Sequence, residues 1–113
     1  MSRLFTMSVA RVYPLYLAKV QKKGRTQAEL DEVMTWFTGF DADELKARVD
    51  AGTTFEEFFA EAPLTADADR ITGVVCGVRV ENIEDPLLQK IRCLDKVVDE
   101  LAKGWSLEKI RRA

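Results

Sequence analysis

The chain has 113 residues, of which 47% are hydrophobic and 32% are charged, and its net charge is −2. This length and composition predict one helical domain over residues 1–113. They exclude a disordered chain and a membrane-spanning protein, because no apolar run approaches the length of a bilayer span. The absence of histidine excludes Ser-His-Asp and Cys-His catalytic arrangements.

The two cysteines, Cys76 and Cys93, are too few for a disulfide framework, and the N-terminal segment lacks the features of a secretory signal. Both observations predict a cytoplasmic protein, because lone cysteines suit a reducing compartment. Two cysteines without a partner histidine or a second pair predict no zinc site, and nothing in the sequence predicts a cofactor. We expect Cys76 to be a small buried residue rather than a nucleophile.

Charge is distributed unevenly along the chain. Residues 1–25 include six basic and no acidic residues, whereas residues 26–69 include twelve acidic and two basic residues. Residues 70–113 include nine basic and seven acidic residues. Two interpretations stay open: the basic segment packs beside the acidic one, within the fold or across a homodimer, or it forms a patch for a polyanion such as nucleic acid.

Three turns share one pattern, in which a glycine is followed two positions later by a capping residue and three positions after that by a glutamate. The copies begin at Gly24, Gly39 and Gly52. Each copy predicts the end of one helix and the immediate start of the next. A fourth glycine, Gly104, precedes the capping residue Ser106 but lacks the glutamate.

Between these turns, apolar residues recur at helical spacing. Helices are predicted, in chain order, over residues 13–23, 27–38, 42–51, 55–62 and 86–103, with a short final helix after Ser106. The first is expected to carry Pro14 in its first turn. The long helix has an apolar seam, and its outer face is expected to pair Lys96 with Glu100 and Asp99 with Lys103. The fold class is therefore predicted to be mainly α, a compact single-domain bundle of about five or six short helices with tight Gly-x-cap turns.

Residues 71–83 are ambiguous. The alternation of Val74, Cys76, Val78 and Val80 is typical of a half-buried strand, whereas Ile71, Val74, Val75 and Val78 also fit a helix. This segment is therefore either a helix or a short β-hairpin.

The chain resembles a family of small bacterial proteins known as domain of unknown function 2200. The stretches that carry the resemblance are VYPLYLAKVQKKGRT (12–26), WFTGFD (36–41), FEEFFAEAP (55–63) and ITGVVCGVRVENIEDPLLQKIRCLDKVVDELAKG (71–104). The resemblance implies a mainly helical bacterial domain and brings no assigned activity.

Asp95 and Asp99 share one face of the predicted helix over 86–103, beside Arg92 and Lys96. This pattern favours a solvated surface with local salt bridges. A hard-cation site is the alternative, but it would need oxygen ligands from several segments.

Two sets of residues are candidates for contact with partners. Lys19, Lys22, Lys23 and Arg25 form a basic cluster that could bind a polyanion, although the acidic residues of the helix over 27–38 would repel phosphate. Trp36 lies off the apolar stripe of its helix, and Trp105 follows a helix end, so each either fills the core or anchors a protein partner or a homodimer.

Together these features favour a non-catalytic protein-interaction or homo-oligomerising module. The alternative is a nucleic-acid-binding regulator that uses residues 19–25. No catalytic, metal-binding or cofactor-binding residue is predicted, and the question of enzymatic activity is left open.

Overall fold

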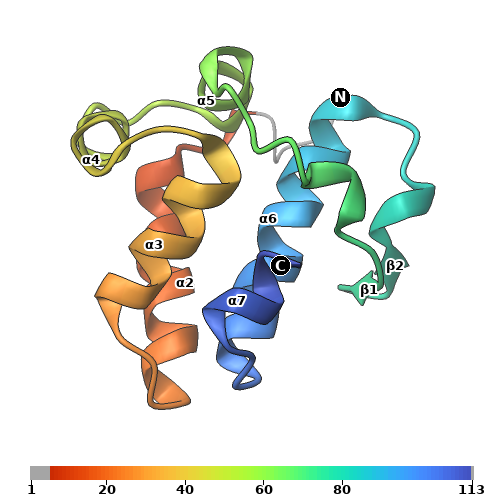
Figure 1. The fold of residues 1–113 in the computed structure, drawn as a ribbon. Coiled ribbons are helices and arrows are strands. Elements are labelled where there is room, and N and C mark those ends of the chain that lie inside the picture. Colours follow the sequence, from red (N-terminus) through yellow and green to blue (C-terminus); the bar gives the residue numbers. More distant parts are fainter. Residues whose placement is uncertain (1–5, 113) are drawn as a thin grey trace.

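The computed structural model describes residues 6–112 and is mainly α-helical, as predicted (Figure 1). Two 3₁₀ turns, η1 and η2, flank a two-stranded antiparallel hairpin. The elements are α2 (Val9–Lys22), α3 (Gln27–Thr38), α4 (Ala42–Asp50), α5 (Phe55–Glu61), η1 (Ala68–Arg70), β1 (Val74–Val75), β2 (Val78–Arg79), η2 (Val80–Asn82), α6 (Pro86–Ala102) and α7 (Leu107–Ile110).

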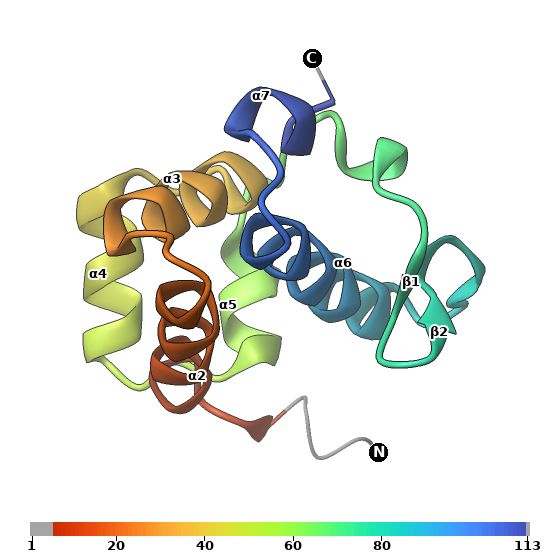
Figure 2. The same cartoon turned by 90° about the horizontal axis from the view of Figure 1, so that it is seen from below.

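The long helix α6 is the centre of the fold. It packs against α2, α3, α5 and α7 and against the hairpin, so that α2 to α5 lie on one side of it and the hairpin on the other (Figure 2). Four of the five residues of its predicted seam, Ile91, Leu94, Val98 and Leu101, are buried, and the fifth, Leu87, is partly buried. Aromatic side chains from α3 and α5, including Phe37, complete the core.

Each of the three glycine turns ends one helix and starts the next, as predicted, but at the second turn Asp41 caps α4 without the expected returning bond from Glu44. Gly24, Gly39 and Gly52 all have left-handed backbone, with φ of 83°, 80° and 72°. Thr26 and Thr54 form complete capping boxes with the glutamates three positions later. The result is a series of short helices that reverse direction within a few residues.

Helix α2 begins four residues before its predicted start. Ser8 caps it, since its hydroxyl oxygen accepts a 3.2 Å hydrogen bond from the amide of Arg11. The prediction that Pro14 lies in the first turn was therefore wrong, because Pro14 lies inside the helix. The early start is held by backbone pairing with the α4–α5 turn, in which the amide of Val9 donates to the carbonyl of Thr53.

The ambiguous segment is a hairpin and not a helix. Val74 pairs with Arg79 and Val75 with Val78, and the connecting residues Cys76 and Gly77 both have positive φ. Such two-residue turns match the twist of the paired strands. The pairing buries Val75 and leaves Val74 and Val78 exposed.

Candidate functional site

The predicted basic cluster lies at the α2–α3 turn, and half of it is neutralised by acidic residues. Lys19 Nζ lies 3.0 Å from the Asp99 carboxylate on α6. The Arg25 guanidinium lies 2.7 Å from the carboxylate of Glu29, in the first turn of α3. Lys22 and Lys23 are exposed and form no ion pair with any residue in 6–112. Only these two cations of the cluster are therefore free within the described part of the chain.

Asp95 and Asp99 have separate sets of partners. Tyr16 donates its hydroxyl hydrogen to Asp95, and the guanidinium of Arg92 donates to the other Asp95 oxygen at 3.0 Å. Burial, together with the charge of Asp95 and the hydrogen bond to it, raises the pKa of Tyr16 well above its usual value.

Asp99 lies between two lysines. Lys19 approaches it from α2, and Lys103 lies 2.9 Å from it on α6. Burial acts to raise its pKa, but the hydrogen bonds and charges of Lys103 and Lys19 outweigh burial and lower it. Within residues 6–112, no group of three or more His, Cys, Asp or Glu side chains is arranged to hold a metal ion.

The two tryptophans pack against the core and remain partly exposed. The Trp36 ring lies 6.4 Å from the ring of Phe37. The Trp105 ring is covered by two cations, with Lys109 Nζ at 4.1 Å and the Arg112 guanidinium at 5.7 Å from its centre. Their contact with a partner stays a prediction.

The outward face of α2 was not singled out from the sequence. It consists of exposed residues at helical spacing, with an apolar centre formed by Pro14, Leu15 and Ala18 and one cation towards each end, Arg11 and Lys22. Leu15 is 64% exposed, the largest value among the exposed large hydrophobic side chains of the described chain. The available signal was that Leu15 falls outside the buried stripe of Tyr16 and Val20.

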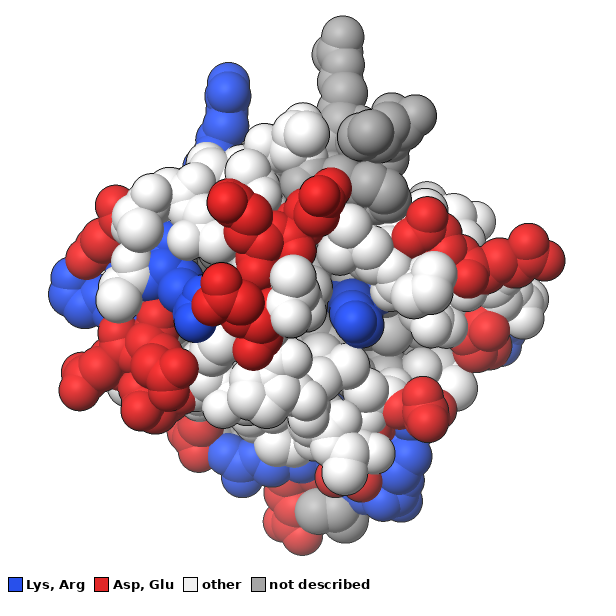
Figure 3. Space-filling view, turned by 90° about the horizontal axis from the view of Figure 1, so that it is seen from above, with Lys and Arg blue, Asp and Glu red and all other residues white. Residues whose placement is uncertain are grey.

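The opposite charge gathers elsewhere on the surface. Helices α4 and α5 and their caps present seven exposed or partly exposed carboxylates, namely Asp41, Asp43, Glu44, Asp50, Glu56, Glu57 and Glu61. Figure 3, which looks down on the end of the molecule where these two helices lie, shows acidic side chains clustered over that face. We call this surface the acidic face. Charge is therefore distributed unevenly over the surface of the protein as well as along its sequence.

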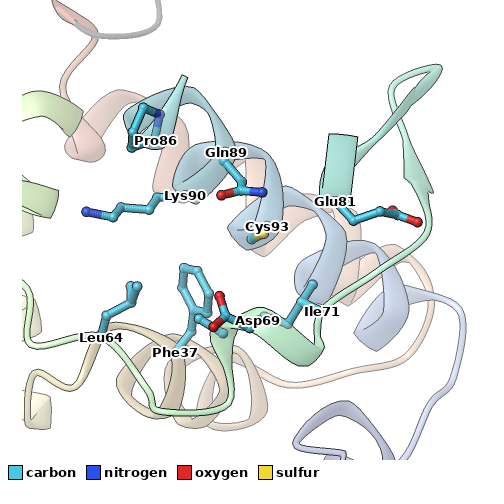
Figure 4. A pocket seen from close by; sticks show the side chains of 10 residues that line it. Phe37, Leu64, Asp69, Ile71, Glu81, Pro86, Gln89, Lys90 and Cys93 are labelled. Carbon is cyan, nitrogen blue, oxygen red and sulfur yellow. The ribbon is translucent and has the colours of Figure 1, made fainter. Parts of the chain in front are cut away.

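Two of the pockets on the described surface are lined by both apolar and charged residues. The first has a volume of about 300 Å³ and lies between α6 and residues 64–71, with Phe37 at its base (Figure 4). The second, of about 330 Å³, lies among α2, α3 and α4 and includes Tyr13 and Asp31. Burial, followed by the hydrogen bond to Asp31, raises the pKa of Tyr13 to about 12, so this hydroxyl is protonated near neutral pH.

Both cysteines are free, but they differ in exposure. Cys76 lies exposed in the hairpin turn, so the expectation that it is buried was wrong. The turn directs it outward because its neighbour Val75 takes the buried position. Cys93 is buried at the base of the first pocket, and burial raises the pKa of its thiol to about 11.

The fold has a close relative among solved structures. The crystal structure of the uncharacterized protein SP1917 is 41% identical, covers 99% of this chain and 93% of its own, and superposes with a TM-score of 0.91. No curated protein matches the chain. Among the described residues, none of the helices combines the length and the apolar character that crossing a membrane requires.

The model of one protein family matches residues 3–112, which is nearly the whole sequence. The stretches that carried the resemblance all fall inside this range. The chain therefore belongs to DUF2200, a family of uncharacterized proteins conserved in bacteria.

Proposed function

We propose that this chain is a non-catalytic protein-interaction module of the bacterial cytoplasm, and that it acts as a single domain through the outward face of α2. The observation that carries the proposal is the exposure of Leu15, at 64%, in the middle of an otherwise amphipathic helix. Together with Pro14 and Ala18, this large side chain forms an apolar centre that a partner can bury. The flanking cations Arg11 and Lys22 would orient the partner on this face.

Charge complementarity determines which surface can bind the outward face of α2. Two α2 helices paired antiparallel would bring Arg11 of one copy towards Lys22 of the other, and α2 has no acidic residue to compensate. Symmetric pairing is therefore opposed by like charges. The acidic face of a second copy has the complementary charge, so we propose a head-to-tail contact between α2 and the acidic face.

Replacing Leu15 with glutamate is expected to weaken self-association by about tenfold or more, because it removes the apolar anchor and adds a charge that the acidic face repels. Sedimentation velocity over a range of protein concentrations at low salt measures the effect. Raising the salt concentration should weaken the wild-type contact in the same experiment.

The matched control is Val78→Glu, which places the same charge on an exposed apolar residue of the hairpin, where Val78 is 43% exposed. This variant should associate as the wild type does. A wild-type chain that sediments as a monomer at every concentration in low salt contradicts self-association. Equal losses in the two variants contradict the assignment to α2.

The alternative function is nucleic-acid binding through the predicted basic cluster. It is favoured by the free ammonium groups of Lys22 and Lys23 and by Lys103, which shares Asp99 with Lys19 and so adds a cation from α6. On this alternative, the wild type should retard a DNA or RNA duplex in a gel at low salt. Replacing Lys19, Lys22, Lys23 and Arg25 with glutamate should abolish the shift, whereas Lys46→Glu on α4 should not. The absence of a shift at low salt would remove this alternative.

A further inference from the structure

We propose that the first pocket binds a compact zwitterionic molecule with an apolar body, of about the size of a free amino acid. This ligand site is separate from the α2 face, because no residue of α2 lines the pocket. The site is defined by an apolar base, a volume of about 300 Å³ and two charged groups at the rim.

The base of the pocket is apolar. Phe37 reaches it from α3, Leu64 and Ile71 come from the segment that follows α5, and Cys93 comes from α6 (Figure 4). Two backbone hydrogen bonds hold this segment against the end of α3, from the amide of Leu64 to the carbonyl of Thr38 at 2.8 Å and from Thr65 to Phe37 at 2.9 Å. The base is therefore preformed and suited to an aliphatic or aromatic group.

The rim carries two charges of opposite sign that are not neutralised. Asp69, from η1, and Lys90, from α6, both line the pocket, and Figure 4 shows them on opposite sides of it. Neither side chain forms an ion pair or a hydrogen bond with any residue in 6–112, and they do not pair with each other.

The other polar groups of the rim already have partners. Glu81 accepts hydrogen bonds from the amide of Gly73 at 3.0 Å and from Arg79 at 3.2 Å, and these interactions, the first above all, lower its pKa. Gln89 donates its amide hydrogen to the carbonyl of Val80 at 3.1 Å. Asp69 and Lys90 are therefore the charges left for a ligand.

The two charges together select the ligand class. A ligand with an ammonium group satisfies Asp69, and one with a carboxylate satisfies Lys90. A molecule with only one charge would satisfy one residue and be repelled by the other, so a zwitterion fits best. A pocket of about 300 Å³ lies at the lower end of the range for small-molecule sites, which favours amino-acid size over nucleotide size.

Leucine and phenylalanine are suitable probes, and isothermal titration calorimetry or NMR chemical-shift mapping measures their binding. We expect N-acetyl-leucine to bind about tenfold more weakly than leucine, because it lacks the ammonium group, and leucinamide to be weakened similarly, because it lacks the carboxylate. In Asp69→Asn the difference between leucine and N-acetyl-leucine should disappear. In Lys90→Gln the difference between leucine and leucinamide should disappear.

Cys93→Phe should abolish binding, because it fills the base of the pocket. Asp69→Asn and Lys90→Gln change surface groups, so they keep the test valid if Cys93→Phe does not fold. The matched controls are Asp43→Asn and Lys46→Gln, which make the same charge changes at the second pocket and should bind leucine as the wild type does. The variant Leu15→Glu should also bind normally, which separates this proposal from the one for α2.

Two results would overturn the proposal. One is that neither probe binds at concentrations of about 10 mM, which corresponds to a very weak interaction. The other is that both probes bind but the Asp69 and Lys90 variants discriminate among the three leucine compounds as the wild type does.

Discussion

Replacing Arg112 with methionine is expected to lower the free energy of unfolding by about 3–5 kcal/mol, the typical loss when a buried ion pair loses one partner. The carboxylate of Glu100 is 1% exposed and accepts two hydrogen bonds from the Arg112 guanidinium, at 2.7 and 2.9 Å. Without the guanidinium, the nearest cation is Lys96 Nζ at 3.8 Å. Chemical denaturation with urea measures the loss.

Arg112 also connects separate parts of the fold. It donates hydrogen bonds to the carbonyl of Arg70 at 3.2 Å and to that of Ile110 at 2.6 Å, and it lies over the Trp105 ring. Its removal should therefore loosen α7 and η1 together. Hydrogen exchange in these two segments, compared with α3, would detect the local change.

A double variant separates the buried charge from the lost packing. If the cost arises from the unpaired carboxylate, Glu100→Met together with Arg112→Met should be much more stable than Arg112→Met alone, because apolar pairs often replace buried ion pairs without loss. The surface control is Lys46→Met, which breaks an exposed ion pair with Asp50 and should leave the midpoint of urea denaturation unchanged. A double variant no more stable than Arg112→Met would show that the contacts of the arginine matter more than the charge of Glu100.

The parts of the fold that were predictable depend on local signals. The glycine turns and the caps of α3 and α5 act over five or six residues, and all of them are visible in the sequence. The apolar seam of α6 is an equally local signal, because five apolar residues on one helix face are stable only when that face is buried. The hairpin was left open because strand and helix periods coincide over so short a segment, and its turn conformation at Cys76 decided the outcome.

Contacts between distant residues were not predictable. Glu100 was expected on the outer face of its helix, paired with Lys96. The pair forms, at 3.8 Å, but the outer position was wrong, because α7 and the following Arg112 fold over Glu100 and bury it, and Arg112 pairs with it. Lys19 is neutralised by Asp99, eighty residues later in the chain. No local pattern encodes either pairing, so the number of free cations in the basic cluster could be known only from the structure.

The same holds for the two candidate functional sites, the outward face of α2 and the first pocket, because no local sequence pattern identifies either of them. In the sequence, Leu15 is one of several apolar residues of α2, and the packing of α3, α4 and α6 against this helix shows which side is left uncovered. Asp69 and Lys90 are twenty-one positions apart and belong to unrelated segments. They become a candidate pair only because α6 and η1 line one pocket.

Replacing Gly39 with alanine is expected to destabilise the protein considerably more than replacing Gly24, although both residues have nearly the same backbone conformation. With φ of 80° and 83°, each alanine should cost about 1–2 kcal/mol for the left-handed backbone alone. At Gly24 nothing lies within 4 Å of the added Cβ. At Gly39 the Cβ would lie 2.9 Å from Pro63 Cβ and 3.2 Å from the amide nitrogen of Leu64.

The clash at Gly39 cannot be relieved by a flexible side chain, because the atoms it meets belong to a proline ring and to the backbone. The amide of Leu64 is also held by its hydrogen bond to Thr38, so relief requires the whole segment to move. Overpacking of this kind adds about 1–3 kcal/mol to the backbone cost. Urea denaturation of both variants, with unchanged m-values, gives the two losses directly.

The same displacement would move Leu64, which lines the first pocket, so Gly39→Ala should also weaken leucine binding, whereas Gly24→Ala should not. Stability and binding are then linked through one close approach of two segments. Equal losses of stability in the two alanine variants would show that the chain at residues 63–64 yields at little cost. In that case the segment would be a poor candidate for a preformed wall, and the pocket would have to be organised by its ligand.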